Sequence, residues 1–378
     1  MSTVITPLLP AGGFAPGVLP SPSPASQSAD RATINSRRKH IAVAILSAFI
    51  AMILFAVLAF HGYVAWIIAH PYVAPLTSNP KIAKNLDYTD VSFPSKSGHT
   101  NVHGWYIPAT AGSSELPRTL ATAAFKTSGS ASPTTLAAAA APSNRTIVFS
   151  HGYGANREET WVPMYDLANL LHRLHYNVFM FDYGYASSTD RSPATGGIEE
   201  SKQLLAAVQY ARSQGADQVV VWGFSMGAGT ALQAALQTDS TDRIDALLLD
   251  SLFLTSPESL YGNVRQYLDL PRYPSMPLIE GMLHFFTGTD FNKIPTEQVI
   301  STAYNIPMYI MHGTDDVKAP LATAEKIASL QSNLLSREWI VKGGKHEMLF
   351  QTRSKEYIQR AALFLSQVDA ARKTTSTT

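Results

Sequence analysis

The sequence predicts an α/β domain in which helices cover both faces of a mostly parallel sheet. Short continuous apolar runs, typical of strands buried on both faces, alternate with segments of helical periodicity. Strands are expected at residues 146–150, 178–181, 219–222, 246–249, 308–311 and 339–341. Helices are expected at residues 157–174, 198–213, 226–236, 322–330 and 355–368. Two earlier strand candidates, residues 88–93 and 102–107, are expected to open the sheet as an antiparallel pair.

The N-terminal part of the chain predicts a membrane anchor. Residues 1–36 are rich in Pro, Ser, Ala and Gly, which predicts a disordered tail. Residues 41–60 carry no charge and follow a basic flank, Arg37 to His40. At 1.5 Å per residue this run reaches about 30 Å, the thickness of the hydrocarbon core. A buried soluble helix is one alternative, but a core helix of that length normally carries a polar face, which residues 41–60 lack. A cleaved signal peptide is the other, but its apolar region is usually shorter and ends at a small-residue site that does not follow Phe60.

The position of the basic residues predicts the orientation of the anchor. They lie before the span, and Lys81 is the first basic residue after it. We therefore expect a single-pass protein with its N-terminus in the cytoplasm and its main domain outside.

Composition narrows the possible functions and indicates where the segments of the chain begin and end. The chain has 378 residues, a net charge of +1 and no cysteine, which excludes disulfides and cysteine nucleophiles and gives no sign of nucleic-acid binding.

Residues 37–69 are expected to form the basic flank and anchor, 70–87 a tether, 88–368 the α/β domain and 369–378 a disordered tail. Within the domain, residues 111–144 read as a low-complexity insertion and residues 252–306 as a cap.

A candidate nucleophile follows the strand at residues 219–222. Ser225 stands at the centre of Gly223-Phe-Ser-Met-Gly227, between that strand and a helix rich in small residues. This setting is typical of a nucleophile elbow, in which a tight strand-to-helix turn displays the serine. A glycine-rich turn with a structural serine is the alternative. If the elbow forms, the backbone N–H of Met226 is one donor to an oxyanion hole.

Possible partners for the serine follow two later strands. Asp315 and Asp316 come directly after residues 308–311, and His346 lies in the loop after the last strand. A serine needs a base to become a nucleophile, and the base needs an acid that fixes its tautomer. The order Ser, Asp, His suits this architecture, and Asp250, which also follows a strand, is a further candidate acid.

These motifs resemble the α/β-hydrolase superfamily over residues 88–368, and within it the membrane-anchored Bem46 and ABHD groups. The resemblance is carried by His151-Gly152, the elbow, His312-Gly-x-x-Asp316 and Gly-x-x-His346. It implies that Ser225 is the nucleophile, Asp316 the acid and His346 the base. It further implies that Tyr153 supplies the second oxyanion donor. Where many relatives have Asp-Tyr-Arg-Gly, this chain has Asp-Tyr-Gly-Tyr at residues 182–185, which leaves the packing of that loop open.

The combined expectation is a membrane-anchored serine hydrolase that cleaves carboxylic ester or thioester bonds through an acyl-enzyme. Its substrate is expected to be a small-molecule or lipid-like acyl ester, with no metal, no cofactor and no nucleic acid. A peptidase, an acyltransferase and a non-catalytic scaffold are the alternatives. The apolar residues of the cap either line the pocket or only pack the cap onto the sheet.

Overall fold

A computed structural model describes residues 24–109, 142–159 and 161–375. Most of the low-complexity insertion, residues 1–23 of the expected N-terminal tail and residues 376–378 lie outside this range. The chain divides into two compact units, Met1–Ala59 and Phe60–Thr378. The division falls within the first helix, so the last turns of that helix belong to the larger unit.

The larger unit is built on one sheet of eight strands in the order β1-β2-β4-β3-β5-β6-β7-β8. The strands are β1 (Thr89–Pro94), β2 (Asn101–Ile107), β3 (Arg145–Ser150), β4 (Asn177–Asp182), β5 (Gln218–Phe224), β6 (Ala246–Asp250), β7 (Met308–Gly313) and β8 (Arg337–Val341). β2 pairs antiparallel with both β1 and β4, and every other pair is parallel. The predicted strands and the predicted fold class are confirmed.

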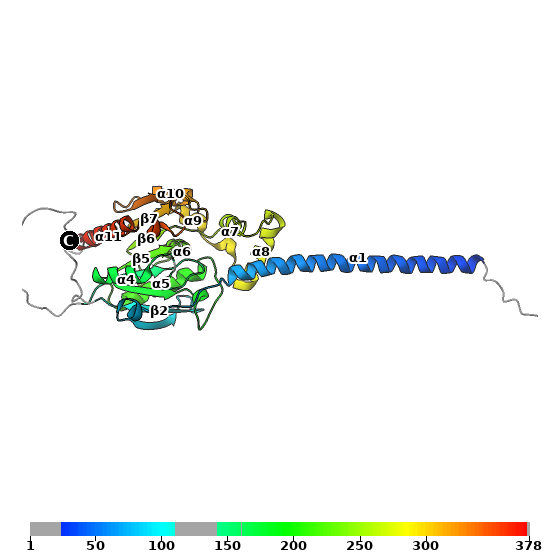
Figure 1. The fold of residues 1–378 in the computed structure, drawn as a ribbon, viewed down its shortest axis with the longest axis horizontal. Helices are drawn as coiled ribbons and strands as arrows, with labels where there is room; N and C mark the ends of the chain where they lie inside the picture. The colour runs from blue at the N-terminus through cyan, green and yellow to red at the C-terminus, as the bar shows by residue number, and fades with distance from the viewer. Residues whose placement is uncertain (1–23, 110–141, 160, 376–378) are drawn as a thin grey trace, which may run out of the picture. The chain divides into compact units, whose positions relative to one another are not determined.

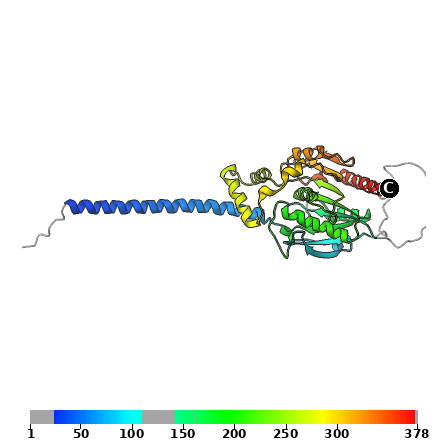
Figure 2. The same ribbon diagram turned by 180° about the vertical axis from the view of Figure 1, so that it is seen from behind.

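Helices cover both faces of this sheet (Figures 1 and 2). One face packs against α5 (Ile198–Ser213), α6 (Met226–Ala235) and α10 (Leu321–Ser329), and the other against α4 (Met164–Arg173) and α11 (Leu349–Thr375). Alternate residues of β5 serve the two cores: Val219 and Val221 face the first set, and Val220 and Trp222 the second. This alternation follows from the two-residue repeat of a strand, and it explains why β5 is apolar throughout.

The register of the central strands places their carboxyl ends at one edge. Gly223 of β5 lies opposite Ser150 of β3, and Phe224 lies opposite Asp250 of β6. On the other side of β6, Asp250 lies opposite Met311 of β7. Loops that follow these strands therefore converge, as expected for ligand chemistry in open α/β sheets.

Two predicted helices have different bounds in the structure. The helix expected at residues 157–174 begins only at Met164, because Arg157 is drawn into a buried pair with Asp182 and because residues before a proline, here Pro163, disfavour helical backbone. The last helix exceeds residues 355–368 and includes residues 369–375, which the sequence analysis assigns to a disordered tail. Asp369 ties it to the sheet by accepting hydrogen bonds from Tyr176 and Gln218 at 2.6 and 2.9 Å.

The segment before the sheet is also more ordered than expected. α1 spans Pro24–Ala69, so residues 24–36 are helical rather than disordered; adding residues to an existing helix costs little compared with starting one. The expected tether, residues 70–87, contains α2 (Pro80–Lys84). Asn79 caps this helix by accepting a hydrogen bond from the N–H of Ile82, and Pro80 occupies its first position.

The chain between β6 and β7, where the sequence predicts a cap, is largely helical. It contains α7 (Pro257–Val264), α8 (Arg272–Thr287), η3 (Phe291–Lys293) and α9 (Thr296–Ser301). α7 and α8 lie at one end of the sheet domain, and α11 runs to the opposite end (Figures 1 and 2). The buried cap residues Met276, Ile279 and Leu283 pack against Val64 and Ala65 of α1. The cap therefore packs in part against the end of α1, while Leu252, Leu254 and Val299 join the core on the sheet.

Candidate active site

Ser225 occupies a strained turn between β5 and α6. Its backbone has φ 51° and ψ −119°, a conformation that residues other than glycine rarely adopt. The flanking glycines allow the close approach that this turn requires. A Cβ on Gly227 would overlap the carbonyl oxygen of Ser150, and one on Gly223 would lie 2.6 Å from Ala228 Cα. The sequence motif thus forms a strand-turn-helix elbow with the serine at its tip.

A continuous hydrogen-bond chain joins the three predicted side chains. Ser225 Oγ lies 2.7 Å from His346 Nε2, and His346 Nδ1 lies 2.7 Å from Asp316 Oδ2. The other carboxylate oxygen of Asp316 accepts the backbone N–H groups of Lys318 and Ala319 at 2.9 and 2.8 Å. Because a carboxylate can only accept, this arrangement assigns the proton of His346 to Nδ1 and leaves Nε2 free to accept from the serine hydroxyl.

Asp316, and not its neighbour Asp315, faces the histidine. Asp315 accepts a hydrogen bond from the Thr314 hydroxyl at 2.8 Å and is exposed. Burial is the largest single influence and raises the pKa of Asp316, but the hydrogen bonds from His346 and Ala319 and the electrostatic influence of His346 and His312 together outweigh it and hold that pKa below its usual value. The carboxylate beside the histidine is therefore ionised at neutral pH.

Asp250, the third candidate acid, belongs to a different network. Its two carboxylate oxygens accept from the hydroxyls of Ser251 and Tyr357 at 2.8 and 2.7 Å. Complete burial raises the pKa of Asp250 to about 6. Its hydrogen bonds tie the end of β6 to α11 and do not include His346.

The loop after β3 lies beside the serine. A Cβ on Gly152 would be 3.5 Å from Ser225 Cβ. Next to Gly152, the backbone N–H of Tyr153 donates no hydrogen bond to any residue that the structure describes, and the same holds for Met226. The two amides predicted to form an oxyanion hole are thus available as donors next to the serine.

His151 shapes this loop and stays neutral. Its Nε2 accepts the N–H of Tyr183 at 3.0 Å, and its Nδ1 lies 2.9 Å from the carbonyl oxygen of Gly152. Burial lowers the pKa of His151 to about 4, so the ring carries no charge at neutral pH.

Glu347 is a site residue that the sequence analysis missed. It follows His346, and its buried backbone N–H donates to Ser251 Oγ at 2.8 Å. A Cβ on Gly152 would overlap Glu347 Oε1, so the carboxyl group lies against the loop beside the serine. Burial, reinforced by the charge of Glu159, raises the pKa of Glu347 well above its usual value. The only sign of this role in the sequence was that Glu347 adjoins His346. Its contact with Glu159 could not be foreseen, because Glu159 falls in a segment predicted to be helical.

The loop at residues 182–185 lacks the arginine that the family resemblance implies, and Arg157 packs it instead. The guanidinium and backbone N–H of Arg157 each donate to the carboxylate of Asp182 at 2.7 Å, and both side chains are buried. Tyr185 then closes the loop by donating to the carbonyl oxygen of Gly152 at 2.9 Å. The question that the sequence left open is answered by a residue outside the motif.

Ser225 and His346 open into an apolar cavity of about 310 Å³. Its walls come from the end of α1, the loop after β3 and the cap, and include Ile67, Ile68, Tyr153, Phe253, Leu260, Val264 and Phe291. Of the cap's apolar residues, some therefore line the pocket while others pack the cap. A cavity of this size and character suits a small or chain-like apolar group next to the serine.

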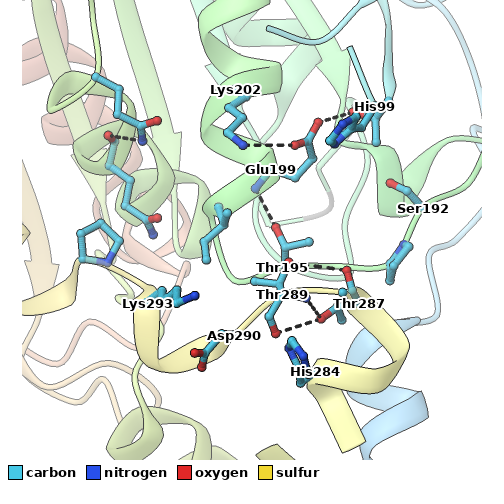
Figure 3. A pocket seen from close by; sticks show the side chains of 17 residues that line it. His99, Ser192, Thr195, Glu199, Lys202, His284, Thr287, Thr289, Asp290 and Lys293 are labelled. Atoms are coloured by element: carbon cyan, nitrogen blue, oxygen red, sulfur yellow. Dashed lines mark hydrogen bonds and ion pairs between the residues drawn. The ribbon is translucent and has the colours of Figure 1, made fainter. Parts of the chain in front are cut away.

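A second cavity, of about 710 Å³, lies elsewhere in the domain (Figure 3). Charged and polar side chains line it, including His99, Glu199, Lys202, Asp290 and Lys293. It contains none of the three hydrogen-bonded residues, so the smaller cavity is the candidate active site. In the described part of the chain, no group of three or more His, Asp or Glu side chains is arranged as metal ligands would be.

Comparison with known proteins agrees with the fold. The family described as "alpha/beta hydrolase fold" matches residues 145–273. The uncharacterized protein YfhR of Salmonella typhimurium is 23% identical over 287 residues, covering 72% of this chain and 81% of that protein. Human protein ABHD12B is 26% identical over 214 residues, covering 54% of this chain and 57% of that protein. The chain thus resembles ABHD-type proteins, as the sequence motifs predict.

Solved structures show the same architecture. The Pyrococcus furiosus esterase Pf2001 superimposes with a TM-score of 0.57 at 18% identity, covering 79% of this chain and 98% of the esterase. The α/β hydrolase GrgF from Penicillium superimposes with a TM-score of 0.52 at 16% identity, covering 75% and 100%. At these identities the likeness establishes the fold.

Proposed function

We propose that this chain, which has the α/β-hydrolase fold, is a membrane-anchored serine hydrolase that cleaves carboxylic ester or thioester bonds. The observation that carries the proposal is the hydrogen-bond chain from Ser225 through His346 to Asp316 at the wall of an apolar cavity. A serine hydroxyl 2.7 Å from an imidazole nitrogen that can accept its proton, with a buried carboxylate behind the ring, is activated for attack on a carbonyl carbon.

The first half of the reaction forms an acyl-enzyme. Ser225 Oγ bonds to the carbonyl carbon while its proton passes to His346 Nε2, and Asp316 stabilises the resulting imidazolium. The charge on the former carbonyl oxygen is met by the N–H groups of Met226 and Tyr153, and one such donor is worth about 2.7–4 kcal/mol of barrier. The tetrahedral intermediate collapses, and the leaving alcohol or thiol takes the proton from His346.

The second half releases the acid. A water molecule gives its proton to His346 Nε2 as its oxygen attacks the acyl carbon, and the same N–H groups again hold the oxyanion. Collapse breaks the bond to Ser225 Oγ, which recovers its proton from His346. The residues return to their starting protonation states, so the cycle needs no other reactant.

The apolar cavity supports an acyl group rather than a peptide as the bound part of the substrate. The lining is mainly apolar, with residues such as Leu260, Val264 and Phe291. Few side chains, such as Asn263 and Lys318, offer partners for the backbone groups of a peptide, whose burial without hydrogen bonds is costly. An acyl chain, in contrast, gains up to about 0.8 kcal/mol for each methylene that leaves water. A small-molecule or lipid-like acyl ester is therefore the substrate class that we propose.

Helix α1 supports the anchor. Residues 33–69 form a helix long and apolar enough to cross a membrane. The apolar side chains from Ile41 to Phe60 are exposed throughout, which in water would be unfavourable. With basic residues before the span, the proposed topology has the N-terminus in the cytoplasm and the catalytic domain outside.

A serine-reactive fluorophosphonate probe on intact membranes tests the function. We expect labelling of the wild-type chain, and of Ser213→Ala as a matched control at an exposed serine of α5, but not of Ser225→Ala. His346→Ala should lower turnover by several decades, because the three residues act as a unit. An unlabelled wild type that hydrolyses no ester or thioester would favour a non-catalytic scaffold, and undiminished labelling of Ser225→Ala would exclude this serine as the nucleophile.

A further inference from the structure

The end of α1 is part of the compact domain that holds Ser225. The larger unit begins at Phe60, inside the helix. Val64, Ala65 and Ala69 are buried, and they pack with the apolar side of α8. Ile67 and Ile68 line the cavity beside the serine. The last turns of the anchor helix therefore form a wall of the candidate active site.

A side-chain hydrogen bond joins this helix end to the predicted oxyanion donor. The phenol of Tyr153 donates to the carbonyl oxygen of Ile68 at 2.7 Å. Ile68 lies in the last turn of α1, where carbonyl groups have no partner within the helix, so Tyr153 satisfies one of them. The backbone N–H of Tyr153 is also the group predicted to face the oxyanion. Through its phenol and its backbone N–H, Tyr153 therefore links the end of α1 to the reacting atoms.

The chain that follows α1 holds the rest of this loop. Asn156 Nδ2 donates to the carbonyl oxygen of Ala74 at 2.8 Å. The carboxylate of Glu158 accepts the backbone N–H groups of Thr77 and Ser78, both at 2.7 Å. Residues 153–158 contain no helix or strand whose own hydrogen bonds would fix them. Residues 68–78 therefore hold Tyr153, Asn156 and Glu158, while the pair of Arg157 with Asp182 holds the far side of the loop.

We propose that the end of α1 is a positioning element of the active site. The Ile68 carbonyl, through the Tyr153 phenol, holds the backbone N–H of Tyr153 where the oxyanion forms, while Ile67 and Ile68 complete the wall of the acyl pocket. The inference rests on the proposed serine hydrolase function and goes beyond it. On this proposal, α1 influences the turnover of the enzyme as well as its attachment to the membrane. Tyr153 contributes to oxyanion stabilisation through its side chain as well as through its backbone N–H.

The size of the effect follows from the role of an oxyanion donor. Removing such a donor lowers kcat by about 10²–10³. Tyr153→Phe keeps the backbone N–H and the ring but releases the loop from Ile68, so the donor is loosened rather than lost. We expect kcat to fall about tenfold with KM unchanged, because the contact matters most when charge develops on the oxygen.

The test compares full-length Tyr153→Phe with Tyr72→Phe in detergent, using p-nitrophenyl butyrate. Tyr72 lies in the chain that follows α1 and is 82% exposed. Its phenol makes no hydrogen bond in the described part of the chain and does not hold the loop, so Tyr72→Phe should leave kcat unchanged. The affinity for a trifluoromethyl ketone, which mimics the tetrahedral intermediate, should fall in Tyr153→Phe in parallel with kcat/KM, while the affinity for the product acid should stay constant. A merely structural role would not separate these two affinities.

The outcomes are distinct. A kcat for Tyr153→Phe within twofold of the wild type, or an equal loss of affinity for both ligands, would overturn the positioning role while the hydrolase function stands. If the wild type is neither labelled at Ser225 nor active, the proposed function itself fails. Should Tyr153→Phe not fold, the double variant Ile67→Ala, Ile68→Ala tests the wall: its KM should rise for an octanoate ester and not for acetate, and equal KM values would refute the inference.

Discussion

Replacing Asp316 by Asn should cut turnover while leaving the fold intact, and the structure explains why. Asp316 Oδ1 accepts two backbone N–H groups, at 2.9 and 2.8 Å, and Oδ2 faces His346 Nδ1. In the variant, the amide oxygen keeps the two backbone donors, so the NH₂ group is left to face the histidine. Since NH₂ is a donor, His346 must accept at Nδ1 and carry its proton on Nε2, where it can no longer take the proton of Ser225.

The cost of restoring the active tautomer sets the magnitude. The amide would have to rotate and leave two partly buried backbone N–H groups without their acceptor, at up to about 1–3 kcal/mol each. The total of about 2–6 kcal/mol corresponds to a fall in kcat of roughly 30-fold to 10⁴-fold. The variant also loses the negative charge beside the imidazolium, so we expect the fall in kcat to lie toward the upper end of this range.

The assay is the steady-state hydrolysis of p-nitrophenyl butyrate, with thermal unfolding measured on the same samples. Asp315→Asn is the matched control, because in the described part of the chain the only side-chain hydrogen bond of Asp315 comes from the hydroxyl of Thr314, and Asp315 does not reach His346. We expect its kcat within about threefold of the wild type, since surface changes are usually worth under ±0.5 kcal/mol. More than a tenth of wild-type kcat in Asp316→Asn, or a larger loss in Asp315→Asn, would refute the assignment of the acid.

Further predictions concern stability, topology and substrate. Burial raises the pKa of Asp250 from 3.8 to about 6, so the folded chain keeps a proton that the unfolded chain releases, and the contribution of Asp250 to wild-type stability should fall by up to about 3 kcal/mol as pH rises from about 4 to 7. Asp250→Asn lacks this titration; in urea unfolding, its stability relative to the wild type should increase over that range, and a difference independent of pH would contradict the shift. Protease added outside intact cells should digest the catalytic domain and spare the N-terminal tail, whereas a mature chain beginning after residue 60 would rule out the anchor. For p-nitrophenyl esters, kcat/KM should rise from acetate toward octanoate by up to roughly fourfold per carbon; a flat or falling series, or faster cleavage of peptide amides, would argue against an acyl pocket.

The sequence by itself determined the strands, the elbow and the order of the three polar residues. These features are local: a strand buried on both faces must be apolar along its length, as in residues 219–222, and a tight turn needs glycines such as Gly223 and Gly227. Because parallel strands end at one edge of the sheet, residues that follow them meet, and the convergence of Ser225 and His346 was predictable from chain order.

Only the tertiary structure decided which groups support that constellation. Asp315 and Asp316 differ by one position, and the turn that closes on the N–H groups of Lys318 and Ala319 selects Asp316 to face the histidine. The bonds from Arg157 to Asp182 and from Tyr153 to Ile68 join residues 25 and 85 positions apart. No periodicity or motif encodes such pairs, since they arise from the way separate loops and the end of α1 pack over the sheet. Because of this packing, the end of an apolar helix that the sequence indicates only as an anchor also lines the candidate active site.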